Sequence, residues 1–374
     1  MPHPAAQERM PVFVAWRELR FARGRFVLIG AVVALITLLV GFLSGLTGGL
    51  AAQNISAVLQ LPGDRIVLQE PTSGSASFAT STLDPDTIDT WEQAAGVESA
   101  VPVGITQSRA SVTGTDEPTG VALFGMPTAD ADNDTNALLS LSPTSDDEVG
   151  LSSGAASDLG ADVGDTITIT GNDYTVASIG DDLWYSHTPV IALTPDAWAQ
   201  ANAAVGGTGE PTVLAVSGTA DWTAVAAQTD TVADTTLTSL TALETFRSEI
   251  GSLALMIAML FGVSALVVGA FFTVWTMQRA GDIAVLKALG ATTGSLVRDA
   301  LGQALVVLIA GIGVGIAAVV GFGTLAGQAL PFVISPLTTL APAVVMALLG
   351  LAGAAFALRT VTTADPLTAL GSNR

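Results

Sequence analysis

Residues 26–50 read FVLIGAVVALITLLVGFLSGLTGGL and contain no charged side chain. A helix needs about 20 apolar residues to cross the hydrocarbon core of a bilayer, and a charge at its centre costs roughly 2.5–3.5 kcal/mol. The stretch is therefore long enough and apolar enough to form one membrane-spanning helix. Two more stretches without charge follow, at residues 250–278 and 300–358.

The third uncharged stretch is 59 residues long, which is too long for a single span. Pro331 and Pro336 interrupt it, and a proline inside a helix removes a hydrogen bond and clashes with the preceding turn. The stretch therefore divides into two helices. In all, the sequence predicts four transmembrane helices, at residues 26–50, 250–275, 300–330 and 337–358.

The composition of the chain fits a membrane protein and argues against several classes of function. Only 12% of the residues are charged, whereas about a quarter are charged in a soluble domain. The chain has no cysteine, which excludes disulfides and thiolate metal sites. Its single lysine, Lys287, is followed by Ala288, whereas a P-loop needs Ser or Thr there. The net charge of −20 argues against nucleic acid as a partner. We expect no nucleotide site and no enzymatic activity in this chain.

The basic residues predict the orientation in the membrane. Ten of the 13 Lys and Arg residues lie in segments 1–25, 276–299 and 359–374, whereas segment 51–249 holds three, with 28 acidic residues. Cytoplasmic loops carry an excess of Lys and Arg. Both termini and the 276–299 loop are therefore expected in the cytoplasm and segment 51–249 outside. This describes a multi-pass protein of the cell membrane, with lipids around its four spans.

A signal peptide is the alternative interpretation of the N-terminus. Arginines precede an apolar stretch, and Leu50-Ala51-Ala52 resembles a cleavage site. Signal peptides, however, have apolar regions of about 7–15 residues. The stretch here is longer, and cleavage would leave an odd number of spans.

The segments outside the spans have their own patterns. Residues 12–25, in the cytoplasmic segment 1–25, carry an apolar stripe that favours an amphipathic helix on the membrane surface, with a plain positively charged flank as the alternative. Segment 51–249 is predicted to be an α/β domain, with residues 126–149 as a loop. Its expected strands are residues 65–69, 108–112, 120–124, 165–169, 174–179, 190–193 and 213–216. Its expected helices are residues 86–95, 151–159 and 195–203.

Catalytic and metal-binding patterns are weak in this domain. His187 follows Ser186 and two aspartates, but a Ser–His–Asp site needs a tertiary arrangement that the sequence does not supply. We interpret this histidine as structural. The acidic residues at 130–134 lack the Gly and the final Glu of a calcium-binding EF-hand loop. We therefore expect a solvated acidic stretch, no metal site and no catalytic residue.

Small residues recur along the first span. Gly41, Gly45 and Gly49 are spaced at i, i+4 and i+8, a spacing that lets two membrane helices approach closely. We predict a helix-packing role for these three residues. The alternative is that glycine is simply common in membrane helices.

The loop between the second and third spans contains MQRAGDIAVLKALGATT at residues 277–293. Asp282 can cap a short helix, and Gly290 suits its C-terminal exit. Ile283, Leu286 and Leu289 then form an apolar stripe along the helix. Such a stripe needs a partner, either another protein or the membrane surface.

The loop residues QRAGDIAVLKALGA, at 278–291, resemble the signature of MacB/FtsX-type ABC permeases, with Asp282 in place of the usual Glu. The tail TADPLTAL at 363–370 and the turn VGDT at 163–166 also resemble that family. The resemblance implies four transmembrane α-helices with an α/β extracytoplasmic domain inserted between helices 1 and 2. It also implies that the loop is a coupling helix that docks on a separate ATPase subunit. The coupling residues would be Arg279, Asp282, Ile283, Leu286, Lys287 and Leu289.

The N-terminal third resembles the haem-exporting Hrt-type permeases, in AWRE at 15–18, LTGGLAAQN at 46–54 and DRIVL at 64–68. This implies a homodimeric permease that exports haem from the membrane and binds no permanent cofactor, while a dimeric ATPase binds ATP. One alternative is export of a glycolipid or amphipathic peptide, as in the related DevC-type exporters. Another is an FtsX-like signalling permease, which transports nothing and controls an envelope hydrolase.

If haem is the substrate, a candidate binding site follows by elimination. Iron ligands in haem proteins are usually His, Cys, Met or Tyr, but cysteine is absent and the His and Tyr residues lie in the N-terminal segment or the outer domain. Near the outer leaflet there remain Glu249, Met256 and Met259. We predict that two copies of Glu249 bind the iron, that residues on the same helix face cover the porphyrin, and that Arg247 pairs with a propionate. The alternative is that Glu249 and Arg247 are ordinary charges at a helix start. The predicted haem-binding residues are Glu249, Arg247, Ser252, Leu253 and Met256.

Overall fold

The computed structural model describes residues 23–114, 117–128, 136–278, 281, 285, 289–290 and 292–362. Most of the predicted amphipathic helix, the acidic stretch at 130–134 and the tail from residue 363 lie outside these residues. The chain divides into two compact units. One comprises Met1–Gly49 and Ser252–Arg374, and the other, which we call the inserted domain, comprises Leu50–Gly251.

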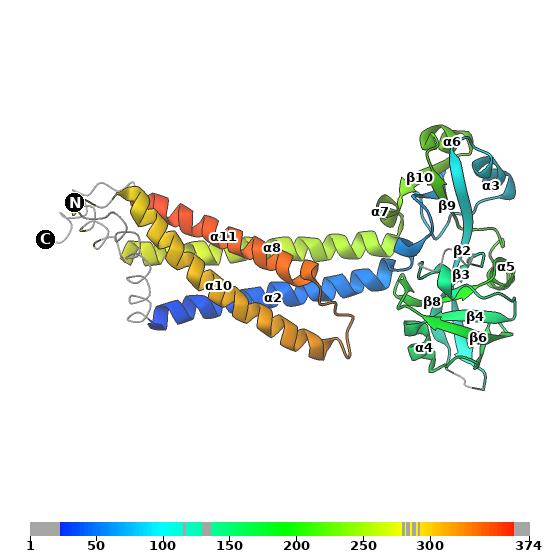
Figure 1. Ribbon diagram of the computed structural model, residues 1–374, viewed down its shortest axis with the longest axis horizontal. Coiled ribbons are helices and arrows are strands. Elements are labelled where there is room, and N and C mark those ends of the chain that lie inside the picture. Colours follow the sequence, from blue (N-terminus) through cyan, green and yellow to red (C-terminus); the bar gives the residue numbers. More distant parts are fainter. Residues whose placement is uncertain are drawn as a thin grey trace, which may run out of the picture. The chain divides into compact units, whose positions relative to one another are not determined.

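Four long helices carry the apolar stretches (Figure 1): α2 (Arg23–Ile55), α8 (Glu244–Gln278), α10 (Thr293–Ala326) and α11 (Pro336–Thr362). Each is long and apolar enough to cross a membrane. The inserted domain lies between the first and second of them in the chain. The predicted fold class, four transmembrane helices with an α/β domain between helices 1 and 2, is therefore confirmed.

The first two of these helices are longer than the spans expected from hydropathy. Helix α2 continues to Ile55, and α8 begins at Glu244. The additional residues are mostly polar, and a helix satisfies its own backbone hydrogen bonds wherever it lies. Hydropathy therefore detects the apolar part of each helix and not its ends.

The helical unit has one apolar core, to which all four helices contribute. Its fully buried members include Val40 of α2 and Leu308 of α10. Helix α8 contributes Val268, Phe272 and Trp275 to this core, although only 11% of its most apolar 18-residue stretch is buried, compared with 28–33% for the other three helices.

Within the described residues, the inserted domain contains ten strands in one sheet system. They are β1 (Arg65–Gln69), β2 (Val97–Val112), β3 (Thr119–Gly125), β4 (Glu148–Ser152), β5 (Thr166–Ile169), β6 (Asn172–Gly180), β7 (Trp184–Tyr185), β8 (Thr188–Leu193), β9 (Val213–Gly218) and β10 (Thr231–Thr235). The order is β10-β1-β9-β2-β3-β8-β4-β6-β5, and β7 pairs with β8.

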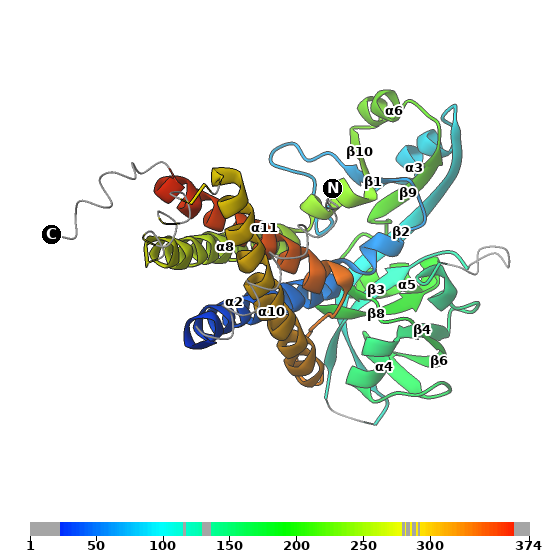
Figure 2. The same ribbon diagram turned by 60° about the vertical axis from the view of Figure 1, so that its left-hand side comes forward.

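The long strand β2 joins two lobes of this domain (Figures 1 and 2). Its first half pairs with β9, in a lobe with β1 and β10. Its second half pairs with both β3 and β5. The second pairing closes β2, β3, β8, β4, β6 and β5 into a ring, which we call the barrel lobe. Closure leaves no free edge in that ring.

Short helices connect and cover the strands. They are η2 (Val58–Gln60), α3 (Pro85–Glu92), η3 (Leu139–Leu141), α4 (Ser153–Leu159), α5 (Pro195–Ala204), α6 (Trp222–Gln228), α7 (Thr236–Ser239) and η4 (Leu240–Ala242). Several begin at a side-chain cap, such as Asp84, which accepts from the Thr87 amide. That hydrogen bond lowers the pKa of Asp84.

The structure corrects the expected loop at residues 126–149 and the expected helix at 151–159. Within the first, η3 and the start of β4 are regular structure. Strand β4 occupies residues up to Ser152, whose hydroxyl accepts from the Ala155 amide and so caps α4. The helix therefore begins two residues later than expected.

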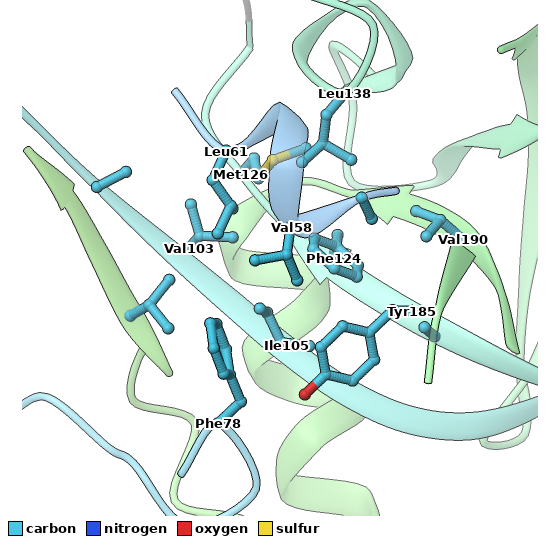
Figure 3. Close-up of a cluster of buried hydrophobic side chains, with 14 of the residues drawn as sticks. Val58, Leu61, Phe78, Val103, Ile105, Phe124, Met126, Leu138, Tyr185 and Val190 are labelled. Carbon is cyan, nitrogen blue, oxygen red and sulfur yellow. The ribbon is translucent and has the colours of Figure 1, made fainter. Parts of the chain in front are cut away.

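One apolar cluster of the inserted domain brings together residues distant in sequence, including Val58, Val103 and Tyr185 (Figure 3). The Tyr185 ring packs edge-on against Phe124, with 5.7 Å between ring centroids. Burial raises the pKa of the Tyr185 phenol, so the side chain stays neutral. This packing fixes β7 and the turn that follows it.

Candidate functional site: a polar cluster around Glu249

The turn between β7 and β8 has an unusual backbone. Tyr185 pairs with Thr188, which leaves a two-residue loop of Ser186 and His187. Their φ angles are +47° and +64°. Positive φ at both positions is the signature of a type I′ hairpin turn, which normally uses Asn-Gly or Gly-Gly. Non-glycine residues in this region cost on the order of 1–3 kcal/mol each, and such strain tends to gather at functional sites.

The backbone of this hairpin is bonded to the end of α2. The amides of Ser186 and His187 donate to the carbonyls of Asn54 and Gln53, at 3.0 and 2.9 Å. The last carbonyls of a helix have no partner within the helix. The hairpin therefore caps the C-terminus of α2, and these bonds offset part of the strain in the turn.

Side chains from three elements meet beside this cap. The His187 Nε2 atom lies 2.8 Å from the Glu249 Oε2 atom. Asn54 of α2 donates through Nδ2 to the same Oε2 atom at 3.4 Å. Asn54 is 1% exposed, whereas the side chains of His187 and Glu249 are 30% and 39% exposed. A buried amide thus lies behind two side chains that reach the surface of the inserted domain.

The hydrogen-bond partners fix the orientation of the Asn54 amide. Thr245 Oγ1, one turn before Glu249 on α8, donates to Asn54 Oδ1 at 2.9 Å. Ser186 Oγ lies 3.2 Å from Thr245 Oγ1 and extends the network to the turn. Because Oδ1 accepts from the hydroxyl, the Nδ2 group of Asn54 is the one that faces Glu249.

The short contact between His187 and Glu249 requires a proton between the two atoms. An ionised carboxylate is only an acceptor, so the His187 Nε2–H donates to it. The Asn54 Nδ2 atom is 3.3 Å from His187 Nε2, and both groups direct their donors at Oε2. The arrangement supplies two donors to a single carboxylate oxygen.

The structure places the predicted haem-binding residues on α8. Glu249 is half-buried within the cluster, and Arg247 is exposed. Ser252, Leu253 and Met256 follow along the same helix, with Met256 49% exposed. Their role in binding haem stays a prediction.

Sequence reasoning missed His187 and Asn54 as partners of Glu249. The sequence alone indicates a structural role for His187 and offers the aspartates before it as its candidate carboxylates. In the structure Asp182 instead accepts from the Trp184 indole at 2.6 Å, and Ser186 contacts Thr245. The only signals in the sequence were a Ser-His pair between two strands and the position of Asn54 just after the first span.

The three glycines of the first span lie at close approaches within the helical unit. A Cβ at Gly41 would be 2.7 Å from Val319 Cγ2 on α10, and one at Gly45 would meet the Phe332 ring. A Cβ at Gly49 would overlap the Pro331 carbonyl. The Val333 amide also donates to the Gly45 carbonyl at 3.1 Å. Helix α2 is thus in close contact with α10 and with the α10–α11 connection.

Most of the predicted coupling residues lie outside the described residues: Arg279, Asp282, Ile283, Leu286 and Lys287. Leu289 is described and is 79% exposed. Its amide donates to the Val285 carbonyl, and Gly290 follows with a φ of +95°. The coupling role of the loop stays a prediction.

The inserted domain also has a polar cleft of about 690 Å³ between β1, α3 and the α6–β10 connection. Four carboxylates line it, from Glu70, Asp84, Asp86 and Asp230, together with several threonines. Among the residues that the structure describes, no Lys or Arg lines the cleft. An acidic cleft repels the anionic propionates of a porphyrin, so it does not suit haem.

The comparisons with known proteins agree with this architecture. Residues 27–233 match the MacB-like periplasmic core domain, and residues 254–366 match the FtsX-like permease C-terminal domain. Two relatives are named putative hemin transport system permease protein HrtB. The one from Staphylococcus haemolyticus strain JCSC1435 is 27% identical over 367 residues, and the one from Staphylococcus epidermidis strain ATCC 12228 is 26% identical over 376. Each comparison covers 96% of this chain and 99% of the relative.

Among solved structures, the periplasmic region of MacB from Actinobacillus actinomycetemcomitans is similar at 12% identity and a TM-score of 0.34. The similarity covers 50% of this chain and 94% of that chain. The MacB-like domain alone matches more than half of the present sequence. The protein is a multi-pass membrane protein that belongs to the MacB/FtsX-type family of ABC transporter permeases.

Proposed function

We propose that this permease exports haem from the membrane and is driven by a separate ATPase subunit. The observation that carries the proposal is the end-to-end similarity to relatives named as hemin transport permeases, over 96% of this chain. Haem is the substrate here and not a resident cofactor.

Glu249 is the proposed iron ligand. Its carboxylate is a hard oxygen donor that suits ferric iron, and it lies at the start of the second span, near the proposed outer interface. Further along α8, Ser252, Leu253 and Met256 would cover the flat apolar face of the porphyrin. Arg247, which is exposed, would pair with a propionate through a charge-assisted hydrogen bond.

A homodimer would complete this site by supplying a second copy of Glu249. The low burial of α8, which is the least buried of the four spans within one copy, supports a second copy against it. Large apolar side chains along the helix are uncovered. They include Leu255, Met256, Met259, Val263 and Leu266, all at least 49% exposed. Both termini and the 276–299 loop are proposed to lie in the cytoplasm, as the distribution of basic residues indicates.

The proposed transport step uses ATP binding on the partner subunit. The loop with Asp282 and Leu286 would dock on that subunit, and closure of the ATPase dimer would move α8 of each copy. This movement would change the space between the two copies and release haem to the outside. In this scheme the permease binds and orients the substrate and takes no part in ATP hydrolysis.

The decisive test is haem binding and haem-stimulated ATPase activity of the purified permease–ATPase complex in lipid vesicles. We expect a ferric haem absorption band that shifts on binding, and ATP hydrolysis that rises with haem. Stimulation by a glycolipid or amphipathic peptide, with no response to haem, would instead support the rival export function. A complex that binds an envelope hydrolase and transports none of these would support signalling.

A further inference from the structure

Both hydrogen-bond donors around Glu249 bind the same one of its two carboxylate oxygens. His187 and Asn54 both direct their hydrogen bonds at Oε2, at 2.8 and 3.4 Å. No hydrogen bond reaches Oε1 from any residue that the structure describes. One oxygen thus accepts from two neighbouring donors while the other remains available, on a side chain that is 39% exposed.

This is the arrangement that a monodentate metal ligand needs. Carboxylates that bind metals are themselves hydrogen-bonded by neighbouring groups, which fix their orientation. A ligand side chain whose own rotamer is locked binds more tightly than one left to rotate freely. Holding Oε2 restricts rotation of the carboxylate and therefore fixes the direction of Oε1.

We propose that His187 and Asn54 are positioning residues for Glu249, which hold Oε2 so that Oε1 faces the haem iron. This inference rests on the proposed haem-export function. It assigns a role to an imidazole of the inserted domain that does not itself bind iron. It also explains why a histidine occupies a turn position with a φ of +64°, where glycine fits better.

The surrounding contacts show that the cluster is preorganised. The Asn54 amide is buried and oriented by the Thr245 hydroxyl. His187 is held at its backbone by the bond to the Gln53 carbonyl, and the turn is anchored by the buried Tyr185. Both donors are therefore in place before any ligand arrives.

The test compares variants of the full-length permease, purified with its ATPase and titrated with ferric haem. His187→Gly removes the imidazole and favours the positive φ of the turn, so folding of the hairpin is retained. His187→Gln keeps an N–H donor at about the position of Nε2. His3→Ala, which removes the only other histidine, is the matched control.

We expect His187→Gly to weaken haem binding by roughly 10–100-fold, the usual effect of losing a group that holds a metal ligand, and to shift the absorption band of bound haem. His187→Gln should restore most of the affinity, and His3→Ala should bind as the unmodified protein does. Thr245→Val, which removes the hydroxyl that orients Asn54, should weaken binding severalfold.

The outcomes separate this role from the proposed function. If the unmodified complex binds no haem, both are wrong. Suppose instead that the unmodified complex binds haem, and that the variants His187→Gly and Thr245→Val bind haem equally well and with the same spectrum. The positioning role is then wrong, and haem export stands. If His187→Gly raises the unfolding temperature while affinity falls and His187→Gln rescues it, the role is established as one of positioning and not of folding.

Discussion

Gly49→Ala should destabilise the helical unit, although alanine is the better helix former. A Cβ at Gly49 would overlap the Pro331 carbonyl and lie 2.8 Å from the Phe332 amide nitrogen. Carbon atoms pack at about 3.5–4.0 Å, so the backbone of the α10–α11 connection must move. We expect that movement also to break the hydrogen bond from the Val333 amide to the Gly45 carbonyl.

The size of the effect follows from three contributions. Overpacking costs about 1–3 kcal/mol, and loss of the hydrogen bond costs about 0.5–1.5 kcal/mol. Alanine gains back about 0.8–1.0 kcal/mol of helix propensity. Gly30→Ala is the matched control on the same helix, because a Cβ there meets no atom within 4 Å. The control variant has only the gain in helix propensity, which both variants share, so the two should differ by about 1.5–4.5 kcal/mol.

The assay is the temperature at which the purified protein in detergent loses its single size-exclusion peak. One kcal/mol corresponds to about 2–4 °C for a unit of this size, so Gly49→Ala should unfold at least about 3 °C below Gly30→Ala. Equal unfolding temperatures for the two variants would refute the close packing of α2 against residues 331–332.

Four further variants test the topology, the coupling loop and the iron ligand. Ser140→Cys should react with an impermeant thiol reagent in intact cells, whereas Thr292→Cys should not; labelling of the latter would overturn the orientation. The double variant Asp282→Ala, Leu286→Ala loses a helix cap worth about 0.5–2 kcal/mol. It should insert into the membrane normally but bind the ATPase weakly in a pull-down. Unchanged binding and efflux would show that the loop does not couple the permease to the ATPase. Glu249→Gln should shift the haem absorption band and sensitise cells to haem, and an unchanged spectrum would move the ligand elsewhere.

The elements predicted well are those whose signal is local. Strands β5 and β6 alternate apolar and polar residues and flank a two-residue turn, Thr170-Gly171, whose φ angles are +50° and +90°. Strand β1 occupies the predicted residues, Arg65–Gln69. The four long helices follow from apolar length alone. Strand β4 was missed because it passes directly into α4 at Ser152, so that one short window holds both a strand and a helix start.

In the candidate site, too, only the residue with a local sequence signal could be predicted. Glu249 could be singled out because it is the last charge before an apolar helix, which is a local feature. Its partners could not, since His187 is 62 residues away and Asn54 is 195 residues away in sequence. The turn that carries His187 lacks the glycine that would identify it as a hairpin. Contacts of this kind depend on how the strands close into a barrel. That closure brings together residues far apart in the chain, so no short stretch of sequence predicts it.

The β7–β8 hairpin also has a mechanical consequence. Its backbone is tied to the last turn of α2, and its His187 side chain is tied to the first turns of α8. Strand β8 continues from it into the barrel lobe, where it pairs with β3 on one side and β4 on the other. If the end of α2 slides past the start of α8, either the distance between His187 and Glu249 must increase or β8 must move along its own axis. The hairpin thus connects the ends of α2 and α8 to β8, a strand inside a closed sheet. A force on the helix ends would act on β8, whose hydrogen bonds to the strands on both sides would oppose its movement.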